Sequence, residues 1–150
     1  MDIRKAIKQN IDFSTEYHKM AVNILFTASW IDLEHAKKLK PFGLTSQQFN
    51  ILRILRGQLP KPATINLLID RMIDKSSNAS RLVDRLEKKG FVKRSANTED
   101  KRAVNVQISE KGLATLKAID GQLNLMEADF KTLTEQEAKE LNRLLDKLRG

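Results

Sequence analysis

The segment SSNASRLVDRLEKKGFVKRSANTEDKRAVNVQIS, residues 76–109, decides the fold. Its first half predicts a helix that ends near Gly90, because its apolar side chains fall on one side at about 100° per residue. These side chains are Ala79, Leu82, Val83 and Leu86. Its second half predicts a half-buried strand, because Val104, Val106 and Ile108 alternate with polar residues. The segment therefore predicts a helix followed by a two-stranded antiparallel hairpin.

The loop of this hairpin, residues 96–102, is unusually long and highly charged. Most hairpin loops take about two to five residues, whereas this loop is longer and contains the cluster Glu99-Asp100-Lys101-Arg102. It has no apolar anchor that could hold it against a core. We therefore expect the tip of the hairpin to project from the body of the protein.

Helical periodicity covers most of the remaining chain. Residues 2–40 repeat apolar side chains at helical intervals, which predicts one long helix or two in series. Capping boxes at Thr45 with Gln48 and at Thr134 with Glu137 predict where two more helices begin.

Three further helix boundaries follow from the pattern. ATINLLIDRMI, residues 63–73, predicts a short helix, and Asp74 is the expected N-cap of the next one. The inward side chains of the short helix are expected to be Ile65, Leu68, Ile69 and Met72. After the hairpin, Ser109 restarts a helix that is expected to reach Phe130. Its apolar positions are Leu113, Leu116, Ile119, Leu123 and Met126.

Charge favours an anionic partner. The chain has 27 Lys and Arg against 19 Asp and Glu, a net charge of +8, which suits nucleic acid or an acidic membrane surface. Residues 75–102 hold nine Lys and Arg against four Asp and Glu, a net charge of +5. Because the positive charge gathers on the helix and hairpin and not on an amphipathic terminal helix, a membrane partner is disfavoured.

Several classes of protein are excluded or disfavoured. The chain has no cysteine, which rules out disulfides, thiolate metal sites and thiol chemistry. His18 and His35 do not share a helix face, so no metal site is expected. No Gly-rich phosphate loop, Ser/His/Asp set or carboxylate pair is evident, so we expect neither a cofactor nor an enzyme. MDIRKAIKQN lacks a signal-peptide core and no run of about 18 apolar residues occurs, which predicts a cytoplasmic protein.

Two short helices joined by a tight turn and followed by a hairpin form a winged helix-turn-helix, whose second helix enters a major groove. The polar face of that helix suits this role, because short side chains let the backbone come close and arginine can fork onto guanine. The candidate contacts are Ser76, Ser77, Asn78, Ser80, Arg81 and Arg85. The alternative is a solvated helix face with an ion pair between Asp84 and Lys88.

SSNASRLVDRLEKKGFVKR followed by EDKRAVNVQIS resembles the recognition helix and wing of the MarR family of bacterial transcription regulators. The most specific element is Asp100-Lys101-Arg102, which matches the family's Asp-x-Arg wing motif. A second element is the frame formed by Arg81, Leu82, Leu86 and Gly90. The resemblance implies a homodimer with interlocking terminal helices, each subunit of which presents a winged helix to half of a pseudo-palindromic operator in double-stranded DNA.

The resemblance also implies a role for the wing. Arg102 would enter the minor groove while the carboxylate of Asp100 holds its guanidinium extended. The candidate wing contacts are Arg94, Thr98, Asp100, Lys101 and Arg102. The alternative is a local Asp–Arg pair that steadies the turn and is worth under about 1 kcal/mol.

Aromatic residues mark a candidate effector pocket. In MarR-like proteins an effector cavity lies between the dimerisation helices and the winged helix. The candidates for contact with a small aromatic or amphipathic effector are Tyr17, Phe26, Trp30 and Phe49. Such stripes also occur as ordinary core or dimer interface, and that interpretation stays open.

The predicted fold class is mainly α with a small antiparallel β-hairpin wing. We expect an N-terminal dimerisation helix region at residues 1–40, a winged helix-turn-helix DNA-binding domain at 41–110 and C-terminal dimerisation helices at 111–150. The predicted function is that of a sequence-specific transcriptional regulator, a homodimeric repressor released by a small molecule. The alternative is a winged-helix module that binds proteins and no specific DNA.

Overall fold

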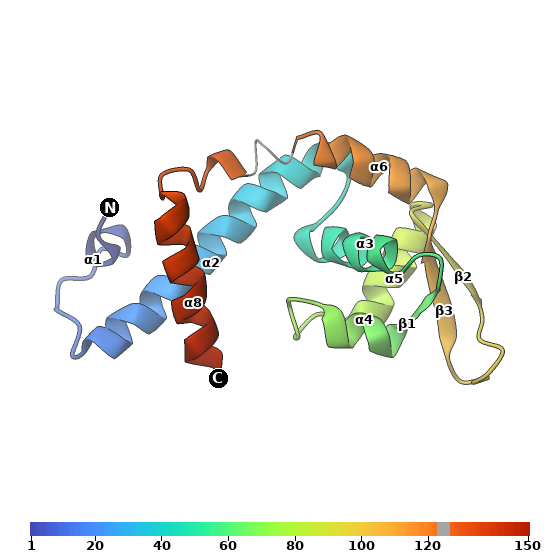
Figure 1. Cartoon of the computed structure of the whole chain (residues 1–150), viewed down its shortest axis with the longest axis horizontal. Coiled ribbons are helices and arrows are strands. Elements are labelled where there is room, and N and C mark those ends of the chain that lie inside the picture. Colours follow the sequence, from blue (N-terminus) through green and yellow to red (C-terminus); the bar gives the residue numbers. More distant parts are fainter. Residues whose placement is uncertain (123–126) are drawn as a thin grey trace.

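The computed structural model describes residues 1–122 and 127–150, which form a mainly helical protein with one small antiparallel sheet (Figure 1). In chain order the elements are α1 (Ile3–Ala6), α2 (Glu16–Leu39), the 3-10 helix η1 (Lys40–Phe42), α3 (Ser46–Gln58), β1 (Ala63–Thr64), α4 (Ile65–Arg71), α5 (Ala79–Lys88), β2 (Val92–Ala96), β3 (Val104–Ile108), α6 (Glu110–Asp120) and α8 (Glu135–Arg149). Helices α3 to α5 and the hairpin of β2 and β3 form a winged helix-turn-helix, which confirms the predicted fold class.

The hydrophobic core lies between α3, α5 and the sheet. α3 contributes Leu52 and Leu55, α5 contributes Val83 and Leu86, and β3 contributes Val106. All five side chains are buried. Burial of such a side chain stabilises a fold by about 1.5–3 kcal/mol relative to exposure. The winged helix therefore has a core of its own.

The sheet has a third strand that the sequence pattern did not predict. Ala63 pairs with Val106 and Thr64 with Asn105, which gives the strand order β1-β3-β2. The predicted helix over residues 63–73 was therefore wrong at its start. It begins at Ile65, where the Oγ1 of Thr64 caps it by accepting a hydrogen bond from the backbone N–H of Leu67 at 3.2 Å. Ile69 lies 42% exposed and not inward as predicted, because the inner face of α4 is formed by Leu68, with Ile65 and Leu67 packed against the core beside it.

The predicted cap of α5 was also wrong. Asn78, and not Asp74, caps the helix, because its Oδ1 accepts a hydrogen bond from the backbone N–H of Arg81 at 3.0 Å. Both residue types cap helices well, and the one next to the buried Ala79 is used. Ser76 and Ser77 therefore precede the helix and lie in the turn between α4 and α5.

The helical regions predicted at residues 2–40 and after Ser109 have different bounds in the structure. Of the two forms expected for residues 2–40, the structure has two helices in series, α1 and α2, with Thr15 as the N-cap of α2. α6 ends at Asp120, ahead of Gly121, and does not reach Phe130 as predicted. Leu123 and Met126 lie outside the described residues.

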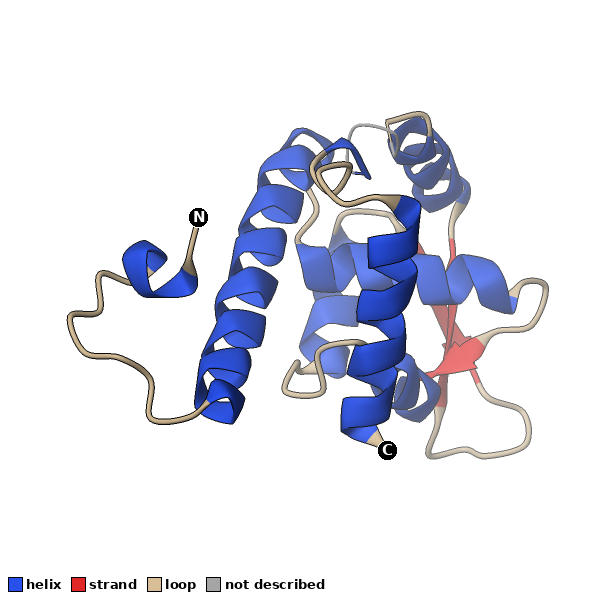
Figure 2. Ribbon diagram, turned by 60° about the vertical axis from the view of Figure 1, so that its left-hand side comes forward, coloured by secondary structure: helices blue, strands red, loops and turns tan. Residues whose placement is uncertain are grey.

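The terminal helices form a separate lobe beside the winged helix (Figures 1 and 2). α2 buries only Leu39, and α8 buries no side chain. Large apolar side chains are exposed along both helices: Tyr17, Met20, Leu25, Phe26, Trp30, Leu33, Leu141, Leu144 and Leu148. Within residues 1–122 and 127–150, no helix is both long enough and apolar enough to span a membrane.

Candidate nucleic-acid interface

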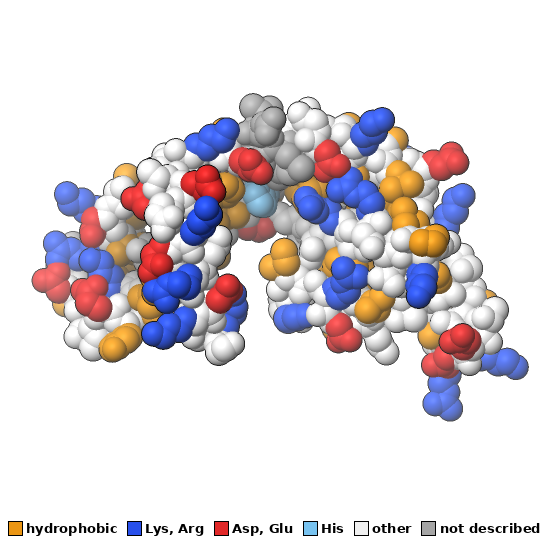
Figure 3. Space-filling model, viewed as in Figure 1, with side chains coloured by type: hydrophobic (Ala, Val, Ile, Leu, Met, Phe, Trp, Pro, Cys, Tyr) orange, Lys and Arg blue, Asp and Glu red, His pale blue; other side chains and the backbone are white. Residues whose placement is uncertain are grey.

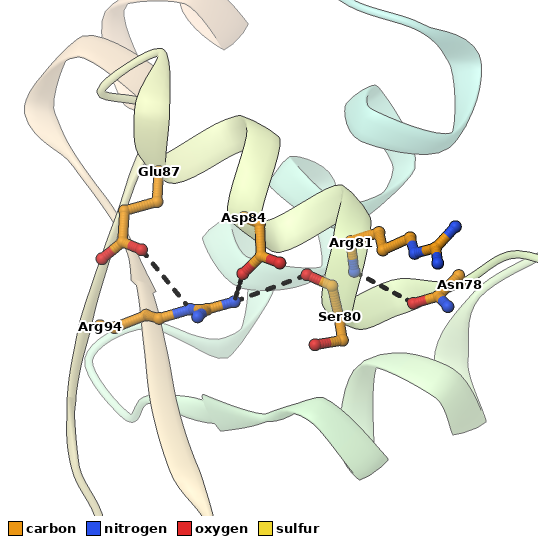
Figure 4. A network of polar contacts seen from close by, with 6 residues as sticks. All are labelled: Asn78, Ser80, Arg81, Asp84, Glu87 and Arg94. Atoms are coloured by element: carbon orange, nitrogen blue, oxygen red, sulfur yellow. Dashed lines mark hydrogen bonds and ion pairs between the residues drawn. The ribbon is translucent and has the colours of Figure 1, made fainter.

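The polar face of α5 presents cations and short polar side chains. Arg81, Arg85 and Ser80 are exposed, and Arg81 extends away from the wing in Figure 4. Neither arginine forms an ion pair within the part of the chain that the structure describes. Asn78 is also exposed, but its side-chain oxygen is occupied as the helix cap. The predicted contacts on this helix therefore lie together, with the two arginine side chains available to a ligand.

The turn before α5 is fixed by short polar side chains. Asn50 of α3 accepts a hydrogen bond from the backbone N–H of Ile73 at 3.0 Å. The Asp74 carboxylate accepts hydrogen bonds from the hydroxyls of Ser76 and Ser77, at 2.6 and 2.9 Å. The hydroxyl of Ser76, then that of Ser77 and the backbone N–H of Ser76, lower the pKa of Asp74 from 3.8 to about 2. The sequence pattern assigned Asp74 only to helix capping and missed this role.

Arg94 joins the wing to α5 (Figure 4). Its guanidinium pairs through Nη2 with the carboxylate of Asp84, and its Nε lies 3.7 Å from the Oε2 of Glu87. The same Nη2 lies 3.5 Å from the carbonyl oxygen of Ser80. Arg94 was predicted to contact DNA, but its guanidinium is engaged within the protein. The alternative ion pair between Asp84 and Lys88 does not form among the described residues, because Asp84 pairs with Arg94 instead.

Strand alternation accounts for this placement. Val92 and Arg94 lie on the same face of β2, and Val92 is buried in the core. The side chain of Arg94 therefore turns toward α5, while that of Lys93 turns away and is exposed. This alternation was present in the sequence and could have identified Arg94 as an inward residue.

The wing tip is ordered by two side chains that bind its backbone. The Oδ1 of Asn97 accepts hydrogen bonds from the N–H groups of Glu99 and Asp100, both at 2.9 Å. The Nδ2 of Asn97 donates to Asn105 on β3 at 3.0 Å. The Oδ1 of Asp100 accepts a hydrogen bond from the backbone N–H of Arg102 at 2.9 Å. Asn97 was not among the predicted site residues, although asparagine at the first position of a loop is typical of such turns.

The predicted contact between the Asp100 carboxylate and the Arg102 guanidinium was wrong. In a tight turn the side chain of an aspartate reaches the backbone two residues on more easily than a long side chain reaches back. No ion pair of Arg102 occurs among the described residues, and its side chain is exposed together with Thr98 and Lys101. Figure 3 shows the Lys and Arg side chains of the wing tip projecting beyond the acidic ones.

The predicted aromatic pocket is not assembled as expected. Tyr17 is 81% exposed, and Phe49 packs against the winged-helix core. Trp30 contacts Phe130 edge to face at 6.1 Å between ring centroids. A cavity of about 450 Å³ lies instead where the end of α2 and η1 meet the end of α6. Its lining residues are Lys38, Leu39, Pro41, Phe42, Ile119, Gln122, Ala128 and Asp129.

The histidines take part in packing. His18 contacts Phe13 and His35 contacts Phe130, each edge to face. Within the described ranges, no group of three His, Cys, Asp or Glu residues is placed to hold a metal ion.

Comparison with known proteins identifies this arrangement. The model of the MarR family matches residues 44–104. The HTH-type transcriptional regulator MgrA of Staphylococcus aureus is 29% identical over 112 residues, which cover 75% of this chain and 74% of MgrA. A cysteine-to-serine mutant of E. coli MarR, crystallised with operator DNA, is 28% identical with a TM-score of 0.78 and covers 92% of this chain and 99% of its own.

A ligand-bound structure is similar to the same extent. The organohalide-sensing transcriptional regulator RdhR, in its 2,4-dichlorophenol-bound form, is 25% identical with a TM-score of 0.80 and covers 94% of this chain and 86% of its own. The family model matches the winged helix itself, and the solved relatives share the fold along the terminal helices as well. The winged helix of this chain, residues 44–104, therefore matches the MarR family model, and over 92% of its length the chain is similar in fold to E. coli MarR.

Proposed function

We propose that this protein is a sequence-specific, double-stranded-DNA-binding transcriptional regulator that works as a homodimer in the bacterial cytoplasm. One observation carries the proposal: α5 and the wing present exposed cations on a rigid winged helix, and Arg94 is the one cation of residues 75–102 that forms an ion pair within the described chain. Free cations on a fixed scaffold are what phosphate neutralisation requires. The similar E. coli MarR protein was crystallised with operator DNA. We assign no enzymatic activity and no cofactor.

The residues divide into contacts and supports. On α5 and the turn before it, the proposed DNA contacts are Ser76, Ser77, Ser80, Arg81 and Arg85, with Asn78 holding the start of the helix. On the wing, the proposed contacts are Thr98, Lys101 and Arg102. Asp100 and Arg94 are supports, because one binds the backbone of the wing and the other binds α5.

The terminal helices are the proposed dimer interface. Their large apolar side chains stay exposed in the described part of one subunit, and a surface of this kind is typical of a protein interface. Residues 1–40 and 111–150 would therefore serve dimerisation and residues 41–110 DNA binding, although α6 also packs Leu116 into the winged-helix core. A two-fold dimer would present two copies of α5 to one side of the duplex.

A small aromatic or amphipathic molecule is the proposed effector, and repression relieved by it is the proposed mode of regulation. The 450 Å³ cavity supports this proposal, because it lies where the terminal lobe joins the winged helix. Its size falls in the range of small-molecule sites, about 300–1,000 Å³. The similar RdhR protein was solved with 2,4-dichlorophenol bound.

Selection of bound fragments from random duplex DNA tests the function. We expect an inverted repeat whose half-site centres lie about one helical turn apart. The logarithm of the affinity should fall linearly with the logarithm of the salt concentration. A protein-binding module would select no sequence, and that result would overturn the proposal.

A further inference from the structure

The Asp74 carboxylate faces both serine hydroxyls of the turn before α5. The Oγ of Ser76 lies 2.6 Å from Oδ1 of Asp74, and the Oγ of Ser77 lies 2.9 Å from Oδ2. The backbone N–H of Ser76 also donates to Oδ1, at 2.9 Å. Each oxygen of the Asp74 carboxylate therefore accepts a hydrogen bond from one serine hydroxyl.

The positions of the two hydroxyl hydrogens follow from the charge of Asp74. Hydrogen bonds from Ser76, then from Ser77, hold the pKa of Asp74 at about 2, so the carboxyl is ionised at neutral pH and carries no hydrogen. An ionised carboxylate only accepts hydrogen bonds. The hydrogen in each short contact therefore comes from the serine.

With this assignment, the two serine hydroxyls can only accept further hydrogen bonds. A hydroxyl has one hydrogen and two acceptor lone pairs, and both hydrogens point at Asp74. Phosphate oxygens, guanine O6 and N7 and thymine O4 are all acceptors, so these hydroxyls have nothing to donate to them. The amino groups of adenine and cytosine are the donors in the major groove.

The turn is held in this state from both sides. Asn50 of α3 binds the backbone of Ile73, and Asn78 caps the helix that follows. Releasing a serine hydrogen toward DNA would break a hydrogen bond to a charged acceptor, which is about twice as strong as a neutral one. The negative charge of Asp74 also disfavours placing this turn against a phosphate.

We propose that Asp74 is a specificity-determining residue, which fixes Ser76 and Ser77 as hydrogen-bond acceptors so that this turn recognises the amino groups of adenine or cytosine in the major groove. This role rests on the proposed DNA-binding function. Asp74 acts through the serines and is not itself a DNA contact.

Modified operators test the proposal. In a duplex selected by the wild-type protein, each adenine is replaced in turn by purine, which lacks the 6-amino group, and each cytosine by 2-pyrimidinone, which lacks the 4-amino group. The affinities of the wild type, Ser76→Ala and Ser77→Ala are measured at one salt concentration. At one or two positions of each half-site, the wild type should lose about 3- to 10-fold in affinity. The matching serine variant should lose nothing further there.

Substitution of Asp74 gives a second readout. The amide of Asp74→Asn both donates and accepts, so it frees a serine hydrogen. Repeated selection with this variant should admit guanine or thymine at the positions where the wild type requires adenine or cytosine. Asp70→Asn is the matched control, because Asp70 is an exposed carboxylate of α4 whose side chain does not contact the serines, and its selected sequence should be unchanged.

The outcomes separate the inference from the function. If the wild type selects an operator but no amino group couples to either serine, the inference is overturned and the function stands. The same holds if the serine variants lose sensitivity to methylphosphonate substitution of the backbone, since that result would make the serines phosphate donors. If no duplex is selected, both are overturned. Ser76→Ala and Ser77→Ala keep the proposal testable should Asp74→Asn fail to fold.

Discussion

Replacing Arg94 by methionine should loosen the wing without removing a phosphate contact. The guanidinium is the bridge between β2 and α5, and methionine keeps an unbranched apolar chain of similar reach. The substitution therefore removes the ion pairs with Asp84 and Glu87 while leaving most of the packing of the side-chain stem in place.

The size of the effect follows from the exposure of the network. The side chain of Arg94 is 29% exposed, and those of Asp84 and Glu87 are 47% and 43% exposed. Pairs at this exposure contribute up to about 1 kcal/mol each. With about 0.2–1 kcal/mol from each of the two pairs, we expect the free energy of unfolding to fall by about 0.4–2 kcal/mol, which for a chain of this size lowers the Tm by roughly 1–8 °C.

Thermal unfolding and salt titration of operator binding together check this prediction. Because Arg94 is engaged by carboxylates, the slope of log affinity against log salt should stay unchanged, although the affinity itself should fall as the wing loses its fixed orientation. Each phosphate contact contributes about 0.9 to that slope. Lys93→Met is the matched control, since it removes the same charge from the exposed face of β2. Its Tm should differ from the wild type by no more than about 2 °C.

The opposite pattern would refute the reasoning. Suppose that Arg94→Met left the Tm unchanged and reduced the salt slope by about one. That result would mean that Arg94 of the wild type leaves its carboxylate partners and contacts a phosphate in the DNA complex. Protein concentration has to be held constant in the unfolding experiments, because the Tm of a dimer depends on it.

Three further predictions concern the wing, the dimer and the turn. Arg102→Ala should leave the Tm unchanged, weaken operator binding by about 1–3 kcal/mol and reduce the salt slope by about one; wild-type binding would contradict a role for the wing. Deletion of residues 135–150 should give an aggregating or unfolded protein in size-exclusion chromatography, and a well-folded monomer that binds operator would argue against an obligate dimer. Since the hydrogen bonds from Ser76 and Ser77 lower the pKa of Asp74 from 3.8 to about 2, their stabilisation is complete above about pH 4 and is lost as the pH falls toward 2. The Tm difference between wild type and Asp74→Asn should accordingly shrink over that range, and a constant difference would contradict this account.

The elements with strong local signals were predictable from the sequence. The two capping boxes placed the starts of α3 and α8, and both form as expected with Thr45 and Thr134 as caps. Alternation placed β3, of which Val106 and Ile108 are buried. These signals act within a few residues and need no tertiary contact to operate.

Elements that depend on partners distant in the sequence were not predictable in the same way. The two residues of β1 are too few for a period, and only pairing with β3 makes them a strand. Asp74 and Asn78 are equally good caps, and the fold uses one for α5 and the other for the serines. The spacing of the aromatic side chains of α2 in the sequence could not distinguish a ligand pocket from a dimer interface, because both place apolar residues at the same helical intervals.

The positive field of the interface depends on arrangement as well as composition. Residues 75–102 contain four acidic side chains, which could have formed ion pairs with the cations that are proposed to bind DNA. Two of them, Asp84 and Glu87, share a single arginine, Arg94, and Asp100 binds the backbone of the wing. These contacts also order the wing before binding, which spares part of the roughly 0.5–1.5 kcal/mol that each immobilised side chain costs on association. The same set of contacts thus leaves most cations free for phosphate and fixes the surface that carries them.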